Sequence, residues 1–152
     1  MRSIYHHCHT DIHNLDPFAD HDIYMIARAV QGEGAHLFKD RRDQAGIAIA
    51  HVVRNQVLSP YFPDEVAQVV REHFHGIAHV GDPDAWATAL AWQSLSLDDT
   101  TCGSVFVLSC QDLHSLGLYH CVRYAQRSFV RGIWELHFFT DWPTTYVKED
   151  IS

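Results

Sequence analysis

The hydrophobic positions in the first two thirds of the chain follow helical periods. An apolar stripe at i, i+3, i+4 and i+7 predicts an amphipathic helix from about Asp20 or Asp22 to Gly32 and Gly34. Residues 35–43 are charged and predict a loop, whereas residues 44–58 are apolar on nearly all sides and predict a buried helix. Two further helices are expected over residues 64–73 and from the cap-like pair 82–83 to about residue 97.

The last third of the chain changes to β-type patterns. Residues 104–108 and 132–140 each predict a strand, the second with Trp134, Leu136 and Phe138 on one face, and residues 119–131 between them fit either helix or loop. Helices followed by a small antiparallel β element predict a mainly helical α+β fold. A chain of 152 residues predicts one domain. We place it at residues 20–143, between an irregular His-rich arm (1–19) and a C-terminal tail (144–152).

The charge of the chain restricts its partners. Eleven Lys and Arg against nineteen Asp and Glu give a net charge of −8 with histidine neutral, whereas a surface that binds nucleic acid is basic. No apolar run approaches the roughly 20 residues of a membrane span. The N-terminus lacks the apolar stretch of a secretory signal, so we expect synthesis in the cytoplasm without a signal peptide. The thirteen histidines make the net charge depend strongly on pH.

The histidines and cysteines are the first candidates for metal binding. Histidines cluster over residues 6–13, 73–79 and 114–120, and the two later clusters lack the local spacing of a zinc site. In the arm, His7, His9 and His13 could share one face of an extended chain and bind zinc, but a flexible, partly charged tail is the favoured interpretation. We therefore predict neither a metal nor a cofactor, and a histidine-rich metal-binding protein is the weakest alternative. The cysteines have no CxxC spacing and reduced thiols are expected, the alternative being a disulfide between Cys102 and a later cysteine.

Glu33 is the candidate for chemistry. It is predicted at the C-terminal end of a helix, where the macrodipole disfavours a carboxylate, and it stands between two glycines that open the backbone to a ligand. A carboxyl group there, shielded by aromatic neighbours, would have a raised pKa, as a general acid near neutral pH requires. The alternative is a solvated carboxylate at a helix end.

The segments around this glutamate resemble the SleB-type cell wall hydrolases. The resemblance is carried by 26–34 (IARAVQGEG), 44–57 (QAGIAIAHVVRNQV) and 61–66 (YFPDEV), and it continues in weaker matches at 69–74, 85–91, 103–109 and 132–139. The segments occur in the family's order over roughly residues 22–142, and this shared order carries the resemblance. The family is similar to lysozyme-like muramidases and lytic transglycosylases, which cleave the β-1,4 bond between N-acetylmuramic acid and N-acetylglucosamine in peptidoglycan.

The resemblance implies a lysozyme-like domain with Glu33 as the catalytic acid and base. It also implies substrate-binding or supporting positions near the cleft at Gln44, Asn55, Phe74, Ser109 and His137. The chain departs from the family pattern in three places. The family's second glutamate is replaced by the pair 36–37 (HL), the loop before Gln44 is longer, and Ser109-Cys110 stands where the family has Asn-Pro.

Two mechanisms remain open at the level of the sequence. Hydrolysis uses two carboxylates, about 5–5.5 Å or about 6.5–9.5 Å apart; candidate partners for Glu33 are Asp40, Asp43, Asp98, Asp99 and Asp112. A lytic transglycosylase uses one carboxyl group for both proton transfers, and we favour this route because the family's second glutamate is missing.

The expected partner is the peptidoglycan glycan strand, bound by a monomer that acts on the wall after release or as part of a virion. A phage-type lysis or wall-penetration enzyme fits this description. The rival interpretation is a non-catalytic wall-binding or virion structural module on the same fold. The aromatic residues are expected mainly in the core, with one or two lining a cleft. Because the wall is anionic, affinity for it should rise as pH falls through the histidine range.

Overall fold

The computed structural model describes residues 20–35, 37, 39–123, 128–133 and 135–143, so the predicted arm (1–19) and tail (144–152) lie outside the described residues. Five helical elements come first: α2 (Asp20–Gly34), α3 (Lys39–Leu58), α4 (Val66–His73), the 3-10 helix η1 (His75–His79) and α5 (Ala85–Ser94). They are followed by β1 (Phe106–Ser109), α6 (Cys110–Ser115), α7 (Tyr119–Arg123), β2 (Phe129–Ile133) and β3 (Leu136–Phe139). The predicted mainly helical α+β fold is confirmed.

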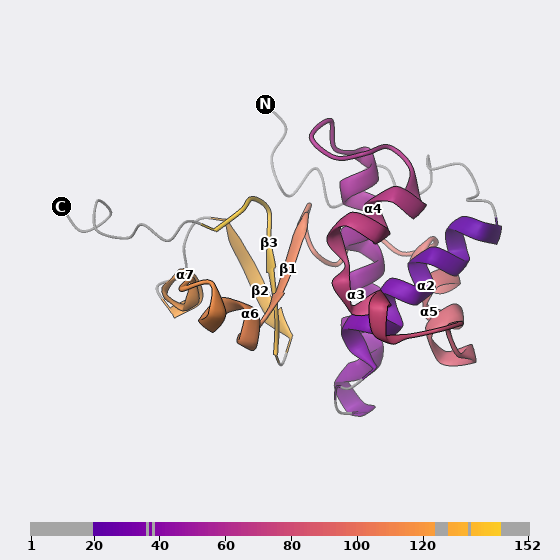
Figure 1. The fold of residues 1–152 in the computed structure, drawn as a ribbon, viewed down its shortest axis with the longest axis horizontal. Helices are drawn as coiled ribbons and strands as arrows, with labels where there is room; N and C mark the ends of the chain where they lie inside the picture. The colour runs from indigo at the N-terminus through magenta and orange to yellow at the C-terminus, as the bar shows by residue number, and fades with distance from the viewer. Residues whose placement is uncertain (1–19, 36, 38, 124–127, 134, 144–152) are drawn as a thin grey trace.

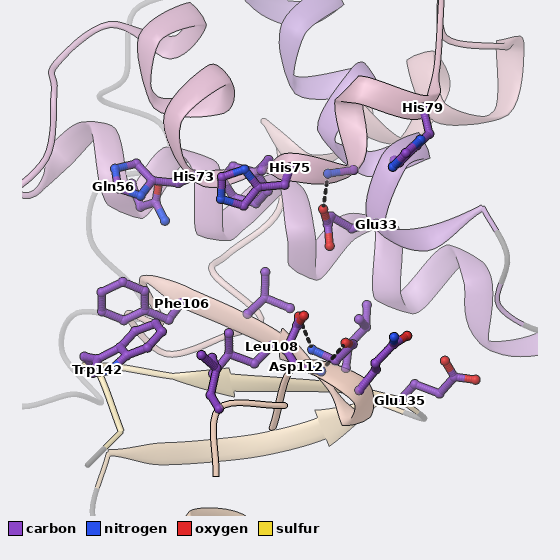
Figure 2. A pocket seen from close by; sticks show the side chains of 18 residues that line it. Glu33, Gln56, His73, His75, His79, Phe106, Leu108, Asp112, Glu135 and Trp142 are labelled. Carbon is purple, nitrogen blue, oxygen red and sulfur yellow. Dashed lines mark hydrogen bonds between the residues drawn. The ribbon is translucent and has the colours of Figure 1, made fainter. Parts of the chain in front are cut away.

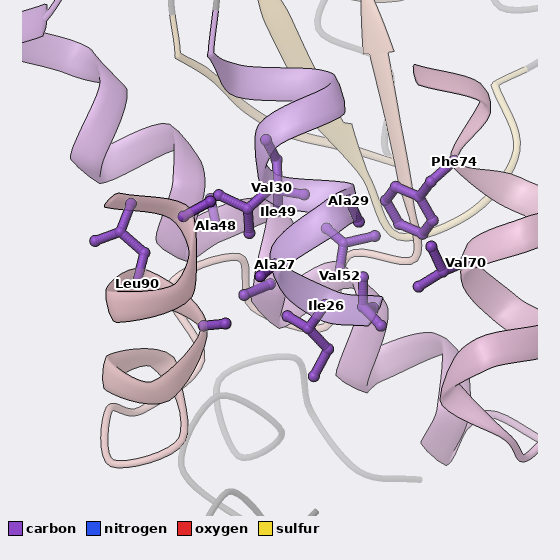
Figure 3. Packing of buried hydrophobic residues seen from close by; sticks show 14 of the residues in the cluster. Ile26, Ala27, Ala29, Val30, Ala48, Ile49, Val52, Val70, Phe74 and Leu90 are labelled. Carbon is purple, nitrogen blue, oxygen red and sulfur yellow. The ribbon is translucent and has the colours of Figure 1, made fainter. Parts of the chain in front are cut away.

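The first two described helices, α2 and α3, form the centre of the helical part. Figure 1 shows α2 to α5 grouped on one side, and the sheet with α6 and α7 on the other. The apolar stripe predicted for α2 is buried, and α3 is buried along most of its length, as its composition predicts. Figure 3 shows these side chains packed between the helices, including Ile26, Val30, Ile49, Val52 and Leu90. Burial of such side chains is the main stabilising term for a helix of this kind.

The three-stranded antiparallel sheet has the order β1-β3-β2, so β3 is its central strand. All four residues of β3 are buried because apolar clusters cover both faces of the sheet. Leu136 and Phe138 point to the helices and belong to the large core, whereas Phe139 belongs to the smaller cluster with residues of α6 and α7. Leu136 and Phe138 therefore share one face as predicted, in agreement with the period of a strand, whereas Trp134, the third residue of that prediction, lies outside the described residues.

Three boundaries differ from the prediction. Helix α3 begins at Lys39, inside the predicted loop, where the Arg42 guanidinium lies 4.2 Å from the centre of the Trp86 ring on α5. Helix α5 is capped by Asp84, whose carboxylate accepts a hydrogen bond from Ala87 N at 3.0 Å. Asp82 is not the cap and accepts a hydrogen bond from the Tyr24 hydroxyl instead. The strand predicted over 132–140 is a hairpin, because the chain turns between β2 and β3.

A buried polar face of α3 holds the segment between α5 and β1. Arg54 Nη1 donates to the Ser94 carbonyl at 2.8 Å. Asn55 Nδ2 donates to Asp99 Oδ2 at 3.0 Å and to the Ser104 carbonyl at 2.9 Å. Burial lowers the pKa of Arg54 to about 10, which still leaves this guanidinium charged at neutral pH. These contacts fix the loop that delivers β1 to the sheet.

The same loop has an unusual backbone at its tip. Cys102 has a φ of 48° and Gly103 a φ of 85°, and Gly103 N donates to Asp99 Oδ2 at 2.7 Å. Glycine suits this position because it adopts positive φ without a steric penalty. Cys102 is disulfide-bonded, so the expectation of reduced thiols is wrong for this residue, whereas Cys110 and Cys121 are thiols as expected. The alternative of a disulfide between Cys102 and a later cysteine is therefore also wrong.

Within the described residues, no helix combines the length and the apolar character needed to cross a membrane.

Candidate active site

A cavity of about 660 Å³ lies between the helical part and the sheet. Its volume is typical of sites that bind small molecules. Figure 2 shows Glu33, His75 and His79 on the helical side, facing Leu108 and Asp112 on the sheet side. The lining residues come from the end of α2, from α3, α4 and η1, from β1 and α6, from the turn between β2 and β3, and from the segment after β3.

Glu33 lies in the last turn of α2 and lines this cavity. Its Oε2 atom accepts a hydrogen bond from Gly76 N at 3.1 Å, drawn as a dashed line in Figure 2. The side chain is half-buried, so the carboxyl group is both oriented and accessible from the cavity. The predicted position of this glutamate at a helix end is confirmed.

Two glycines allow this contact. A Cβ atom on Gly76 would lie 2.6 Å from Gly32 O and 2.7 Å from Glu33 Oε2, and a Cβ atom on Gly32 would lie 2.7 Å from the Gly76 carbonyl carbon. No side chain fits at either position without a shift of the backbone. The sequence analysis predicted that Gly32 opens the backbone to a ligand. In the structure Gly32 instead allows η1 to approach closely at Gly76. Gly34 packs against the Ile49 side chain in the core.

Arg28 lies on α2 five residues before Glu33 and joins this helix to η1. Its Nη2 atom lies 3.2 Å from the Ile77 carbonyl and 3.2 Å from the Val80 carbonyl and donates to both. Because Gly76 belongs to the same 3-10 helix, this guanidinium stabilises the position of the N–H group that contacts Glu33.

The sheet side of the cavity contributes two carboxylates. Ser109 ends β1 and caps α6: its hydroxyl accepts from Asp112 N, and Asp112 Oδ2 accepts from Ser109 N, each at 3.0 Å. Glu135 lies in the hairpin turn, and its carbonyl accepts from Cys110 N at 2.8 Å. The structure thus brings Asp112 and Glu135 into one cavity with Glu33.

The residues that the resemblance placed near a cleft divide into two groups. Glu33, Phe74 and Ser109 line the cavity, with the Phe74 side chain also part of the large core. The other three residues do not line the cavity, and their role in substrate binding stays a prediction. Gln44 is exposed on α3, Asn55 holds the loop before β1, and His137 is buried in β3. Burial lowers the pKa of His137, which favours a neutral imidazole.

Among the carboxylates proposed as partners of Glu33, Asp112 lines the cavity. The Asp99 carboxylate accepts hydrogen bonds from Asn55 Nδ2 and Gly103 N in the loop before β1. Asp43 accepts a hydrogen bond from Trp86 Nε1 at 2.5 Å. Glu135 was not among the predicted candidates. The sequence pattern predicts a single strand over residues 132–140, which would place Glu135 within it. The pairing of Ile133 with Leu136 shows instead that the chain turns here, and this turn brings Glu135 to the cavity.

The histidine cluster over residues 73–79 also belongs to this site. His73, His75 and His79 all line the helical side of the cavity. Among the residues that the structure describes, no group of three or more His, Cys, Asp and Glu side chains is arranged to hold a metal ion. The arm with its further histidines lies outside the described residues.

Comparison with solved structures shows a known catalytic domain fold. The chain matches the catalytic domain of the Bacillus cereus SleB protein with a TM-score of 0.64 and 21% sequence identity, over 82% of this chain and 93% of that one. It matches the catalytic domain of the germination-specific lytic transglycosylase SleB from Bacillus anthracis with a TM-score of 0.63 and 22% identity, over 82% and 98%. The sequence matches no protein-family model, and no curated protein was found to match it. The resemblance to SleB-type enzymes is therefore confirmed at the level of the fold.

Proposed function

We propose that this protein cleaves the glycan strands of peptidoglycan, with Glu33 as the acid and base of a lytic transglycosylation. The observation that carries the proposal is the position of this carboxyl group, oriented by Gly76 N–H in the wall of a cavity, in a chain with the SleB catalytic fold. One of the matching structures is described as a lytic transglycosylase, which makes peptidoglycan the substrate to test.

In the proposed reaction one carboxyl group transfers two protons. Glu33 first donates its proton to the glycosidic oxygen as the bond between this oxygen and C1 breaks. The resulting carboxylate then accepts the proton of the sugar's own 6-hydroxyl group, and O6 bonds to C1 to close a 1,6-anhydro ring. No water is consumed, and the carboxyl group ends in its starting state.

Hydrolysis remains the alternative because other carboxylates line the same cavity. It would need one of them as the second carboxylate. Replacement of Asp112 would also remove its capping contact with Ser109 N on α6, so a loss of activity there would not separate the two mechanisms. Glu135, which lines the same cavity from the hairpin turn, is the residue that we choose to separate them.

The test compares Glu33→Gln, Glu135→Gln and the control Glu72→Gln, which replaces an exposed carboxylate on α4 outside the cavity lining. Release of soluble fragments from purified sacculi should fall by about 10²-fold or more in Glu33→Gln, because an amide cannot donate the proton. It should persist in the control. In Glu135→Gln it should persist under transglycosylation and be lost under hydrolysis.

Mass spectrometry of the fragments gives an independent answer, because anhydro ends are lighter by one water than reducing ends. Full activity of Glu33→Gln would refute the assignment of the acid. A wild-type protein that binds sacculi and releases nothing would instead support the non-catalytic wall-binding or virion module.

A further inference from the structure

A row of four aromatic rings runs along one end of the cavity. The His73 ring lies 5.0 Å from Phe62, Phe62 lies 5.6 Å from Phe106, and Phe106 lies 5.1 Å from Trp142, all between ring centres. These rings come from four different segments of the chain, and three of them, His73, Phe106 and Trp142, line the cavity. Figure 2 shows Phe106 and Trp142 at one end of the cavity and Glu33 toward the other.

Trp142, like His73, is an exposed member of this row. Its relative exposure is 49%, and it lines the cavity. The edge of one ring faces the plane of the other in the Phe106–Trp142 pair, with an angle of 80° between the ring planes. This arrangement is a favoured aromatic geometry, so the indole is supported while part of its surface stays open. A supported ring loses little side-chain entropy when a ligand covers it.

A buried polar atom lines the same cavity. Gln56 is 2% exposed, and its Nε2 atom donates to the Val105 carbonyl at 2.6 Å, which fixes the direction of the amide. Its Oε1 atom is buried and has no hydrogen-bond partner among the described residues. A buried acceptor without a partner is costly, and a hydroxyl or N–H group of a ligand, or a water that bridges to one, would satisfy it.

We infer that this end of the cavity is a sugar-binding subsite, in which the Trp142 indole, backed by Phe106, covers the apolar face of a hexosamine ring. The ring's hydroxyl or acetamido N–H groups then face the Gln56 amide. An apolar surface joined to a few convergent polar groups is the usual composition of a small-molecule site. The inference rests on the proposed function for its ligand class. Because Trp142 lies away from Glu33, the sugar in this subsite is not one of the two sugars joined by the glycosidic oxygen that Glu33 protonates.

The experiment measures binding without cleavage. Isothermal titration calorimetry is performed on Glu33→Gln protein with a β-1,4-linked tetramer of N-acetylglucosamine as the probe. Trp142→Ala and Trp142→Phe are added to this background. The matched control is Trp92→Ala, since Trp92 on α5 is also 49% exposed but lies outside the cavity lining.

Trp142→Ala should weaken binding by about tenfold, from the loss of stacking and of buried area. Trp142→Phe should recover part of the loss, and Trp92→Ala should bind as tightly as its parent. Equal affinity of Trp142→Ala and Trp92→Ala, or no binding of the tetramer to the parent, would overturn the inference. The melting temperature of each variant shows whether it is folded.

The two proposals fail separately in these experiments. If the protein binds the tetramer through Trp142 but does not cleave sacculi, the subsite is supported and the catalytic proposal is refuted. If cleavage depends on Glu33 but the affinity for the tetramer does not depend on Trp142, only the subsite is refuted.

Discussion

His51 couples the stability of this fold to pH. The imidazole is fully buried on α3, where Thr100 N donates to Nδ1 at 3.0 Å and Nε2 lies 3.0 Å from the Ser94 carbonyl. A ring nitrogen that accepts an N–H bond carries no proton, so the proton of the neutral ring is on Nε2 and is donated to Ser94. The Thr100 hydroxyl, 2.9 Å from Nδ1, is the second contact of this nitrogen.

The expected effect follows from the lowered pKa of this ring. Burial first, and the charge of Arg54 second, lower the pKa of His51 from its ordinary value of 6.5 to about 4. The unfolded chain therefore binds the proton more readily than the folded one. The free energy of unfolding is therefore higher by about 3 kcal/mol above about pH 6.5 than it is below about pH 4. It falls as the pH drops through this range, and about 2 kcal/mol is already lost at about pH 5.

The assay is urea unfolding of the wild type and of His51→Gln at about pH 7.5 and about pH 5. Glutamine keeps a donor for the Ser94 carbonyl but does not titrate, so the variant should be less stable than the wild type at the higher pH and lose about 2 kcal/mol less on acidification. Histidines common to both proteins cancel in this difference. An equal loss in both proteins would refute the lowered pKa of His51.

Three further substitutions test the site and its supports. Gly76→Ala should reduce cleavage of sacculi strongly through displacement of the N–H group from Glu33, whereas Gly81→Ala, whose Cβ atom would meet nothing within 4 Å, should leave it intact; equal activities would contradict this view of the contact. Asn55→Ala should cost about 1–3 kcal/mol in urea unfolding, because the carboxylate and carbonyl that it satisfies stay buried. A cost below about 0.5 kcal/mol would show that the loop before β1 is held by other contacts. Ser109→Ala should cost about 1 kcal/mol through loss of the α6 cap, and an unchanged midpoint would argue against it.

The sequence predicts those parts of the fold that depend on local periodicity. The stripe of α2, the buried character of α3 and the shared face of Leu136 and Phe138 were all visible as spacing, because burial of one face imposes its period on the chain. Helix α2 ends at Gly34 as predicted, and this end places Glu33 at the cavity.

Boundaries that depend on distant partners were missed. Residues 39–43 are too polar for a buried stripe, yet they are helical, and Arg42 and Asp43 contact Trp86 on α5. Asp82 and Asp84 are equally good caps in sequence. The choice between them depends on Tyr24, whose hydroxyl donates to Asp82 at 2.6 Å.

The identity of the site shows the same division. Periodicity and residue order predict one glutamate at a helix end, in segments whose order resembles a SleB-type enzyme. The three-dimensional arrangement is needed to show that Gly32 and Gly76 meet to orient this glutamate, that Glu135 and Trp142 line its cavity, and that Asn55 bonds to the loop before β1. The physical reason is that a side chain's period along the chain reports which face is buried, whereas its partners come from segments that the fold alone brings together.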